Sequence, residues 1–264
     1  MRHGIFHPGK PVESIPIVEQ LARHKPDPYH FFRNFGDRIF WPEEEQMFRE
    51  RGIQPMVTWE PYEYALEDIA AGEHDAIIAH ADADIAAYGL PFLVRFGHEF
   101  NGGWYPWGQQ PDALHDSFRH VAQRLRQNAP NARMVWCPNV IGGGSVDDDL
   151  GAYWPGSTYV QWVGIDGYNW GGSQWQSFQQ VIRPTYVALQ PLSGRPFMIC
   201  ETGSAEGGGS KATWINQIKP VCERQMPRIS VVCWFNHDER SDGKGDWRID
   251  SSLSSLAAYR QMVS

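Results

Sequence analysis

Eight short apolar segments recur along the chain and alternate with helix-like stretches. The apolar segments are residues 4–7, 29–35, 54–59, 92–96, 133–138, 160–165, 197–200 and 229–235. The helix-like stretches, several with apolar residues at three- and four-residue spacing, include residues 42–51, 74–88, 111–127, 175–189 and 211–223. Strands that alternate with helices favour a parallel sheet. Eight such units predict an α/β fold that consists of a single (β/α)8 TIM barrel.

The length of the chain agrees with one barrel. It has 264 residues, and a barrel of this kind takes about 250. No linker, low-complexity segment or short-period repeat divides the sequence, so we expect residues 1–264 to form one domain. Aromatic residues make up 13% of the chain and include 12 tryptophans. Tryptophan either packs in a core or stacks on sugar rings, so each one needs separate consideration.

Charge and cysteine usage exclude several classes of function. The net charge is −8, so we expect no nucleic-acid partner and no anionic membrane surface. No apolar run reaches the roughly 18 residues that a membrane helix requires. The four cysteines lack the spacing of zinc or redox motifs, and we expect no metal and no cofactor. The four cysteines are Cys137, Cys200, Cys222 and Cys233. We further expect a monomer.

The first residues of the chain bear on the cellular compartment. Residues 1–8 do not have the composition of a signal peptide. We therefore expect a cytoplasmic protein, or a secreted one if a signal peptide has been removed.

Two glutamates follow apolar segments and carry the clearest chemical signal. Glu99 comes shortly after the fourth segment, and Glu201 directly follows the seventh. Because the carboxyl ends of barrel strands meet at one face, we expect these side chains to lie together there. One acid that protonates a leaving oxygen and one carboxylate that attacks are what a glycosidase needs. A retaining enzyme would place the two carboxyl groups about 5–5.5 Å apart.

The residues around Glu99 suggest how its protonation is controlled. Arg95 shares its side of the strand by alternation, and it either orients the two catalytic carboxylates or satisfies a structural one. Trp104 and Trp107 are expected to exclude water and raise the pKa of Glu99, and Trp104 is also a candidate sugar platform. His98 faces away unless the chain bulges, so it is either structural or a substrate contact.

Alternation also predicts the interior of the seventh strand. With Glu201 facing inward, Phe197 and Ile199 should point into the barrel, while Met198 and Cys200 face the helices.

Further candidates lie at the ends of other segments. Asp166 and Tyr168 are two residues apart, so both are expected at the barrel mouth. Asp166 would fix either a sugar hydroxyl or Arg95, and Tyr168 would either hold Glu201 or pack in the core. Trp59 and Trp234 are candidate sugar platforms. Trp247 and Arg248 lie in the loop after the eighth segment, which forms either a subsite or a capping segment.

Four motifs together resemble glycoside hydrolase family 26. They are His98-Glu-Phe-Asn-Gly-Gly-Trp104-Tyr-Pro-Trp107, Gly164-Ile-Asp-Gly-Tyr168-Asn-Trp170, Glu201-Thr-Gly-Ser-Ala-Glu206 and Asp246-Trp-Arg-Ile-Asp250. The resemblance implies a retaining barrel enzyme with Glu99 as general acid/base and Glu201 as nucleophile. It also implies that the site is lined by His98, Trp104, Tyr168, Trp247 and Arg248.

The resemblance narrows the substrate to a β-linked polysaccharide. Most members of the family are similar to β-1,4-mannanases. However, residues 58–64 and 166–178 look more like the lichenase branch, which cuts mixed-linkage β-1,3;1,4-glucan. We therefore expect a lichenase that acts on mixed-linkage glucan. The alternative substrates are β-1,4-mannan and then β-1,3-xylan. A carbohydrate-binding protein without catalysis and a metal-dependent hydrolase are the competing classes.

Overall fold

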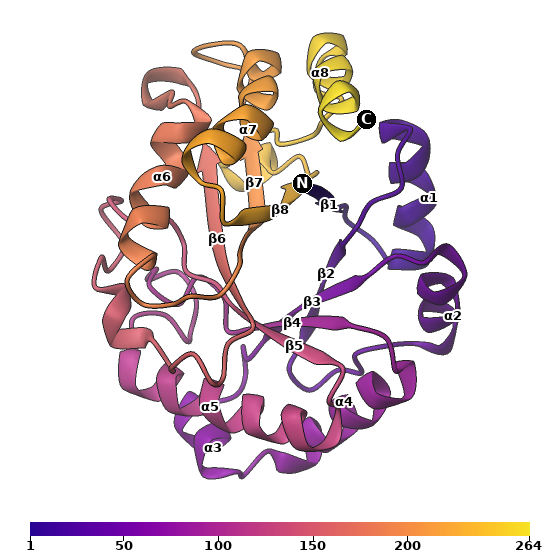
Figure 1. Cartoon of the computed structure of the whole chain (residues 1–264), viewed down its shortest axis with the longest axis vertical. Helices are drawn as coiled ribbons and strands as arrows, with labels where there is room; N and C mark the ends of the chain where they lie inside the picture. Colours follow the sequence, from indigo (N-terminus) through magenta and orange to yellow (C-terminus); the bar gives the residue numbers. More distant parts are fainter.

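The protein forms a closed barrel of eight parallel strands that follow one another in chain order (Figure 1). The computed structural model describes residues 1–264. The strands are β1 (Arg2–Phe6), β2 (Tyr29–Asn34), β3 (Pro55–Glu60), β4 (Phe92–Phe96), β5 (Ala132–Trp136), β6 (Trp162–Asn169), β7 (Phe197–Ser204) and β8 (Ile229–Phe235). The prediction of a single TIM barrel is confirmed.

Helices surround the barrel on all sides (Figure 1). They are α1 (Pro11–Ala22), α2 (Pro42–Arg51), α3 (Leu66–Ala71), α4 (Asp75–Tyr88), α5 (Pro111–Asn128), α6 (Phe178–Leu189), α7 (Lys211–Gln225) and α8 (Leu253–Val263). The arrangement is not fully regular. Two helices follow β3, whereas only a short 3-10 turn (Leu150–Tyr153) lies between β5 and β6. No helix has both the length and the apolar character needed to cross a membrane.

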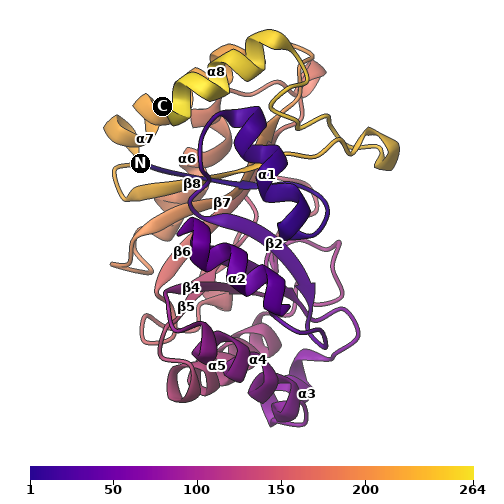
Figure 2. The ribbon, with the colours of Figure 1, turned by 90° about the vertical axis from the view of Figure 1, so that its right-hand side faces the viewer.

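The chain termini lie close together beside β1 and α8 (Figure 2). The loop between β8 and α8 extends from the other end of the barrel in the same view. Because β1 runs from the terminal end towards that loop, the loop belongs to the carboxyl ends of the strands. This is the end at which barrel enzymes carry their active sites.

The barrel has two separate apolar layers. The larger one, with 57 buried residues, fills the space between strands and helices. The smaller one lies inside the barrel. Residues of β3, β4, β5, β7 and β8 form it, together with Cys137, which directly follows β5. Its members are Met56, Leu93, Val135, Cys137, Met198, Cys200, Val231 and Cys233. All four cysteines are free and buried.

The predicted alternation along β7 is wrong. Met198 and Cys200 face the barrel interior, whereas Phe197 and Ile199 pack in the outer layer. The register with β6 explains the difference, because Ile199 pairs with Ile165 while Glu201 pairs with Asp166. One extra residue therefore bulges in β7, and the bulge allows two consecutive side chains to serve the barrel side.

Close packing inside the barrel generates a stability prediction. A Cβ atom on Gly164 would lie 2.6 Å from Cys137 Sγ and 2.7 Å from Cys200 Sγ. Gly164→Ala should therefore lower the free energy of unfolding by about 1–3 kcal/mol, because the interior cannot expand. Urea unfolding measures the change. The control is Gly144→Ala, whose Cβ would meet no atom within 4 Å. Equal stability of the two variants would contradict this view of the interior.

Candidate active site

Glu99 lies in a tight turn at the end of β4. The strand stops at Phe96, and Gly97 and Glu99 both take left-handed backbone conformations with φ of 53° and 50°. The Glu99 amide donates to the carbonyl of Cys137 at 2.8 Å, which ties the turn to β5. A non-glycine residue with positive φ carries strain, and such residues concentrate at functional sites. The turn also breaks the simple alternation that the sequence predicted for this segment.

Two side chains donate hydrogen bonds to the Glu99 carboxyl group. Asn139 Nδ2 binds Oε1 at 2.6 Å, and Trp104 Nε1 binds Oε2 at 2.8 Å. Burial, and then the charge of Glu201, raises the pKa of Glu99 to about 7, although both donors and Arg95 oppose the rise. Glu99 is only 7% exposed. Burial thus raises the pKa as expected, but Trp104 acts as a hydrogen-bond donor that lowers it.

Glu201 is held by donors on both of its oxygens. Arg95 Nη2 binds Oε1, and the Tyr168 hydroxyl donates to Oε2 at 2.7 Å. The side chain is 5% exposed. Of the two roles considered for Tyr168, the structure therefore shows contact with Glu201. Two fixed donors orient the carboxylate and leave it little rotational freedom.

Arg95 is completely buried beneath the pair and makes contacts to several strands. It binds both Asp166 and Glu201, and its Nε donates to Thr58 Oγ1 at 2.7 Å. The structure therefore pairs Asp166 with Arg95, the second of the two partners considered for it. A nitrogen of His98 and carboxylate oxygens of Asp166 and Glu201 lie within 4.8 Å of one another. Arg95 binds both carboxylates, so this group is suited to an ion pair and does not favour a divalent cation.

His98 is buried at the mouth and packs among aromatic rings. Its Nε2 is 3.2 Å from the Tyr105 hydroxyl, while Nδ1 has no partner. Burial, and then the charge of Arg95, lowers the pKa of His98 well below its ordinary value. Trp107 is also buried, with Nε1 donating to the His98 carbonyl at 2.7 Å. Trp107 therefore supports the turn, whereas Trp104, which is 45% exposed, presents a ring at the surface.

Trp59 and Trp234 do not form sugar platforms, and these two predictions are wrong. Both rings are buried in the outer layer. Trp59 packs 4.5 Å from Phe35, and Trp234 lies edge-on to Trp214 of α7 at 5.9 Å. The reason is strand parity: their neighbours Thr58 and Cys233 face the interior, so the tryptophans face the helices.

Trp247 is held in the loop after β8 and reaches the site only through other side chains. Its ring is buried 4.9 Å from that of Tyr168. The exposed member of this aromatic group is Trp170, which is 51% exposed and stands edge-on to Trp247 at 5.3 Å. Trp247 thus supports Tyr168 and offers no free stacking surface.

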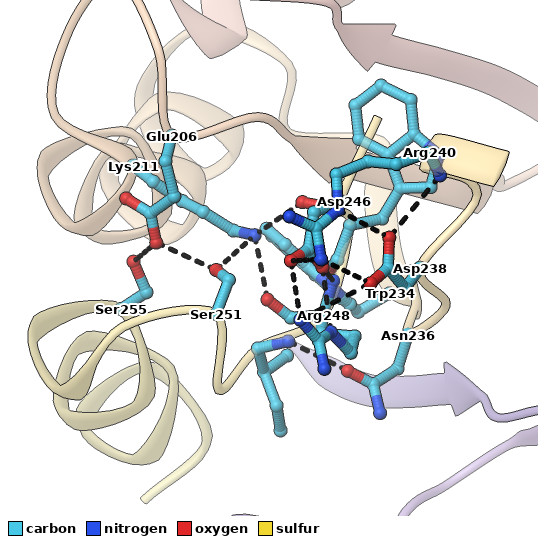
Figure 3. A network of polar contacts seen from close by, with 12 residues as sticks. Glu206, Lys211, Trp234, Asn236, Asp238, Arg240, Asp246, Arg248, Ser251 and Ser255 are labelled. Atoms are coloured by element: carbon cyan, nitrogen blue, oxygen red, sulfur yellow. Dashed lines mark hydrogen bonds and ion pairs between the residues drawn. The ribbon is translucent and has the colours of Figure 1, made fainter. Parts of the chain in front are cut away.

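Figure 3 shows the polar network that orders this loop. Lys211 is buried at the start of α7, and its Nζ donates to the carbonyls of Asp246 and Arg248 at 3.0 and 2.7 Å. Arg248 makes two hydrogen bonds to the Asp246 carboxylate, at 2.8 and 2.6 Å, and lies 3.4 Å from Asp238. The guanidinium of Arg248 is therefore occupied within its own loop, which matches the capping alternative.

Sequence reasoning missed two residues of the mouth. Asn139 binds Glu99, and its position directly after the predicted fifth segment, three residues after the end of β5, was a usable signal. Glu60 ends β3 and is 9% exposed, and its strand parity with Thr58 was the signal that could have found it. The assembled site therefore holds one carboxyl group with a raised pKa beside one oriented carboxylate. This arrangement can donate a proton to a leaving oxygen and attack the carbon that it leaves.

Comparison with known proteins places this site in a family. The sequence model of glycosyl hydrolase family 26 matches residues 41–223. Endoglucanase H of Acetivibrio thermocellus is 37% identical over 96% of this chain and 29% of its own length. Beta-1,3-xylanase TXYA of a Vibrio species is 32% identical over 69% of this chain and 42% of its own length. The chain thus spans less than half of either relative.

A solved structure supports the fold. The GH26 beta-mannanase BoMan26A from Bacteroides ovatus superposes with a TM-score of 0.70 and 16% sequence identity. The match covers 99% of this chain and 88% of that one.

Proposed function

The chain belongs to glycosyl hydrolase family 26, and we propose that it is a retaining endo-β-glycan hydrolase whose substrate is mixed-linkage β-1,3;1,4-glucan. The observation that carries this proposal is the asymmetry of the two glutamates. Glu99 is buried with a pKa of about 7, whereas Glu201 is fixed by Arg95 and Tyr168. Two carboxyl groups in different environments are what the acid and the nucleophile of a retaining glycosidase require.

The reaction proceeds in two steps. An oxygen of Glu201 attacks the anomeric carbon while the glycosidic bond breaks, and Glu99 gives its proton to the departing oxygen. The ionised Glu99 then accepts a proton from water, whose oxygen attacks the same carbon and releases Glu201. Asn139 and Trp104 favour the ionised state of Glu99 between the two steps, because both donate to its oxygens.

The glucan is preferred for two reasons. The segments 58–64 and 166–178 resemble the lichenase branch, and the relative from Acetivibrio thermocellus is named as an endoglucanase. β-1,4-Mannan is the alternative, because mannose differs from glucose only in the direction of one hydroxyl group. Exposed aromatic rings at Trp104 and Trp170 favour endo action on a long chain. Since a polysaccharide cannot enter a cell, we propose that the enzyme acts outside it.

The proposed activity is tested by reducing-sugar release from barley β-glucan and carob galactomannan, measured side by side. We expect release from β-glucan. The control is Glu201→Ala, which should lose turnover by several orders of magnitude while it retains its fold and binds oligosaccharide, because only the attacking oxygen is removed. Release from galactomannan alone would replace the glucan with mannan. Hydrolysis of neither polymer, or full turnover by Glu201→Ala, would overturn the proposal.

The acid role of Glu99 is tested with substrates that differ in leaving group. Glu99→Ala should slow hydrolysis of the polymer by about 100-fold or more, since proton transfer typically contributes that much. Aryl glycosides with acidic phenol leaving groups should be spared in their first step, because their departing oxygen needs little protonation. Measurement of kcat/KM on both substrates shows whether Glu99 protonates the leaving oxygen. An equal loss on the two would assign Glu99 a different role.

The pH profile tests how the Glu99 proton is held. Because the acid must be protonated, kcat/KM should fall as the pH rises through about 7. Asn139 donates to the carboxyl group and lowers its pKa, so Asn139→Ala should move this alkaline limb to higher pH. The control is Asn128→Ala, whose side chain binds Asp82 away from the site. A limb that stays in place or moves to lower pH in Asn139→Ala would contradict the assignment.

A further inference from the structure

Glu60 is a buried carboxyl group without a partner at the mouth of the barrel. It is the last residue of β3, two positions after Thr58, which contacts Arg95 inside the barrel. Strand alternation therefore directs Glu60 towards the same side, one layer nearer the mouth. Its backbone carbonyl accepts from Phe35, but its side chain makes neither a hydrogen bond nor an ion pair.

A backbone contact places Glu60 beside the turn that carries Glu99, because the Gly97 amide donates to the carbonyl of Trp59 at 3.1 Å. Burial raises the pKa of Glu60 to about 7, and the charges of Arg95, Glu201 and Glu99 all act on it. Arg95 could neutralise it, but that guanidinium is already engaged by Asp166, Glu201, Thr58 and His30. Glu60 thus faces the site while its acceptor oxygens remain unused.

The carboxyl oxygens of Glu60 reach the solvent at the mouth, because they are not among the fully buried side-chain atoms that lack a hydrogen-bond partner. A ligand in the mouth can therefore displace water from these oxygens and bind them directly. Adjacent hydroxyl groups of a sugar ring supply two donors to one carboxylate, and charge-assisted hydrogen bonds of this kind are strong. Tyr62, two residues further along, is 45% exposed and adds an aromatic surface. Burial, and then the charge of Glu60, raises the pKa of the Tyr62 hydroxyl to about 12.

We propose that Glu60 is a substrate-binding residue that accepts hydrogen bonds from hydroxyl groups of the sugar ring bound beside Glu99 and Glu201. This inference rests on the proposed function, because it assumes a carbohydrate in the mouth. It assigns no proton transfer to Glu60. The residue selects and holds the ring, whereas Glu99 and Glu201 carry out the reaction.

The proposal is tested by calorimetric binding of a mixed-linkage glucotetraose and of mannotetraose to Glu201→Ala, so that turnover does not interfere. Adding Glu60→Ala should weaken binding of the preferred tetrasaccharide about 10- to 100-fold, as expected for loss of hydrogen bonds to a charged group. Glu60→Gln, which keeps one acceptor, should give a smaller loss. The matched control is Glu63→Gln in the same segment, where the side chain is exposed.

Two further measurements separate binding from other roles. In the otherwise unchanged enzyme, Glu60→Gln should raise KM and move the alkaline limb of kcat/KM slightly to lower pH, because the charges of Glu60 and Glu99 raise each other's pKa and the variant removes one of them. Thermal unfolding should show no loss of stability, since an unpartnered carboxyl group is removed. Unchanged tetrasaccharide affinity in both Glu60 variants, or an equal loss in Glu63→Gln, would overturn the proposal. Failure of the proposed function would appear differently, as wild-type protein that hydrolyses neither polymer.

Discussion

The buried guanidinium of Arg95 is the interaction on which the rest of the mouth depends. It binds Asp166 of β6 and Glu201 of β7 while its Nε contacts Thr58 of β3. An uncompensated charge in the barrel interior would cost several kcal/mol, so none of these groups is stable there without the others. Because the partners come from three strands, these side chains meet only in the closed barrel. The free cysteines below Arg95 complete the interior with small, weakly polar side chains.

Arg95 is one cation among more carboxyl groups than it can neutralise. The two carboxyl groups at the mouth that it does not contact both have raised pKa values. Arg95 is engaged by Asp166 and Glu201, which leaves Glu99 and Glu60 without a cationic partner in contact. Burial raises the pKa of each of these two to about 7. They differ in their neighbours: Glu99 receives hydrogen bonds from Asn139 and Trp104, whereas Glu60 receives none. The same shortage of positive charge therefore leaves Glu99 as a hydrogen-bonded acid and Glu60 as an unused acceptor.

Much of this arrangement was predictable from local sequence. The eight strands, and the gathering of Glu99 and Glu201 at one face, follow from periodicity and from the direction of parallel strands. Alternation placed Arg95 on the barrel side, where it binds Glu201, although the turn at Gly97 and Glu99 breaks that alternation. Trp59 and Trp234 were assigned wrongly because residue type was given more weight than strand parity. Parity alone would have turned both towards the helices and turned Glu60 towards the mouth.

Other features could not be predicted because they depend on contacts between distant segments. The bulge at Cys200 becomes visible only when β7 is paired with β6 and β8. The extension of β6 and β7 to Asn169 and Ser204 likewise reflects their mutual pairing, and it carries Tyr168 within reach of Glu201. No single segment contains the information for either feature. Register between neighbouring strands, and not local propensity, decides them.

The loop after β8 shows how support from outside the barrel reaches Glu201. Lys211 and Arg248 hold this loop through backbone carbonyls and carboxylates (Figure 3). The loop in turn places Trp247 against Tyr168, whose hydroxyl binds Glu201. A tryptophan in a loop would normally have little reason to be buried, but here the ammonium of Lys211 fixes the backbone on both sides of it. The orientation of Glu201 therefore depends on Arg95 from below and on this loop from the side, and each constrains a different carboxylate oxygen.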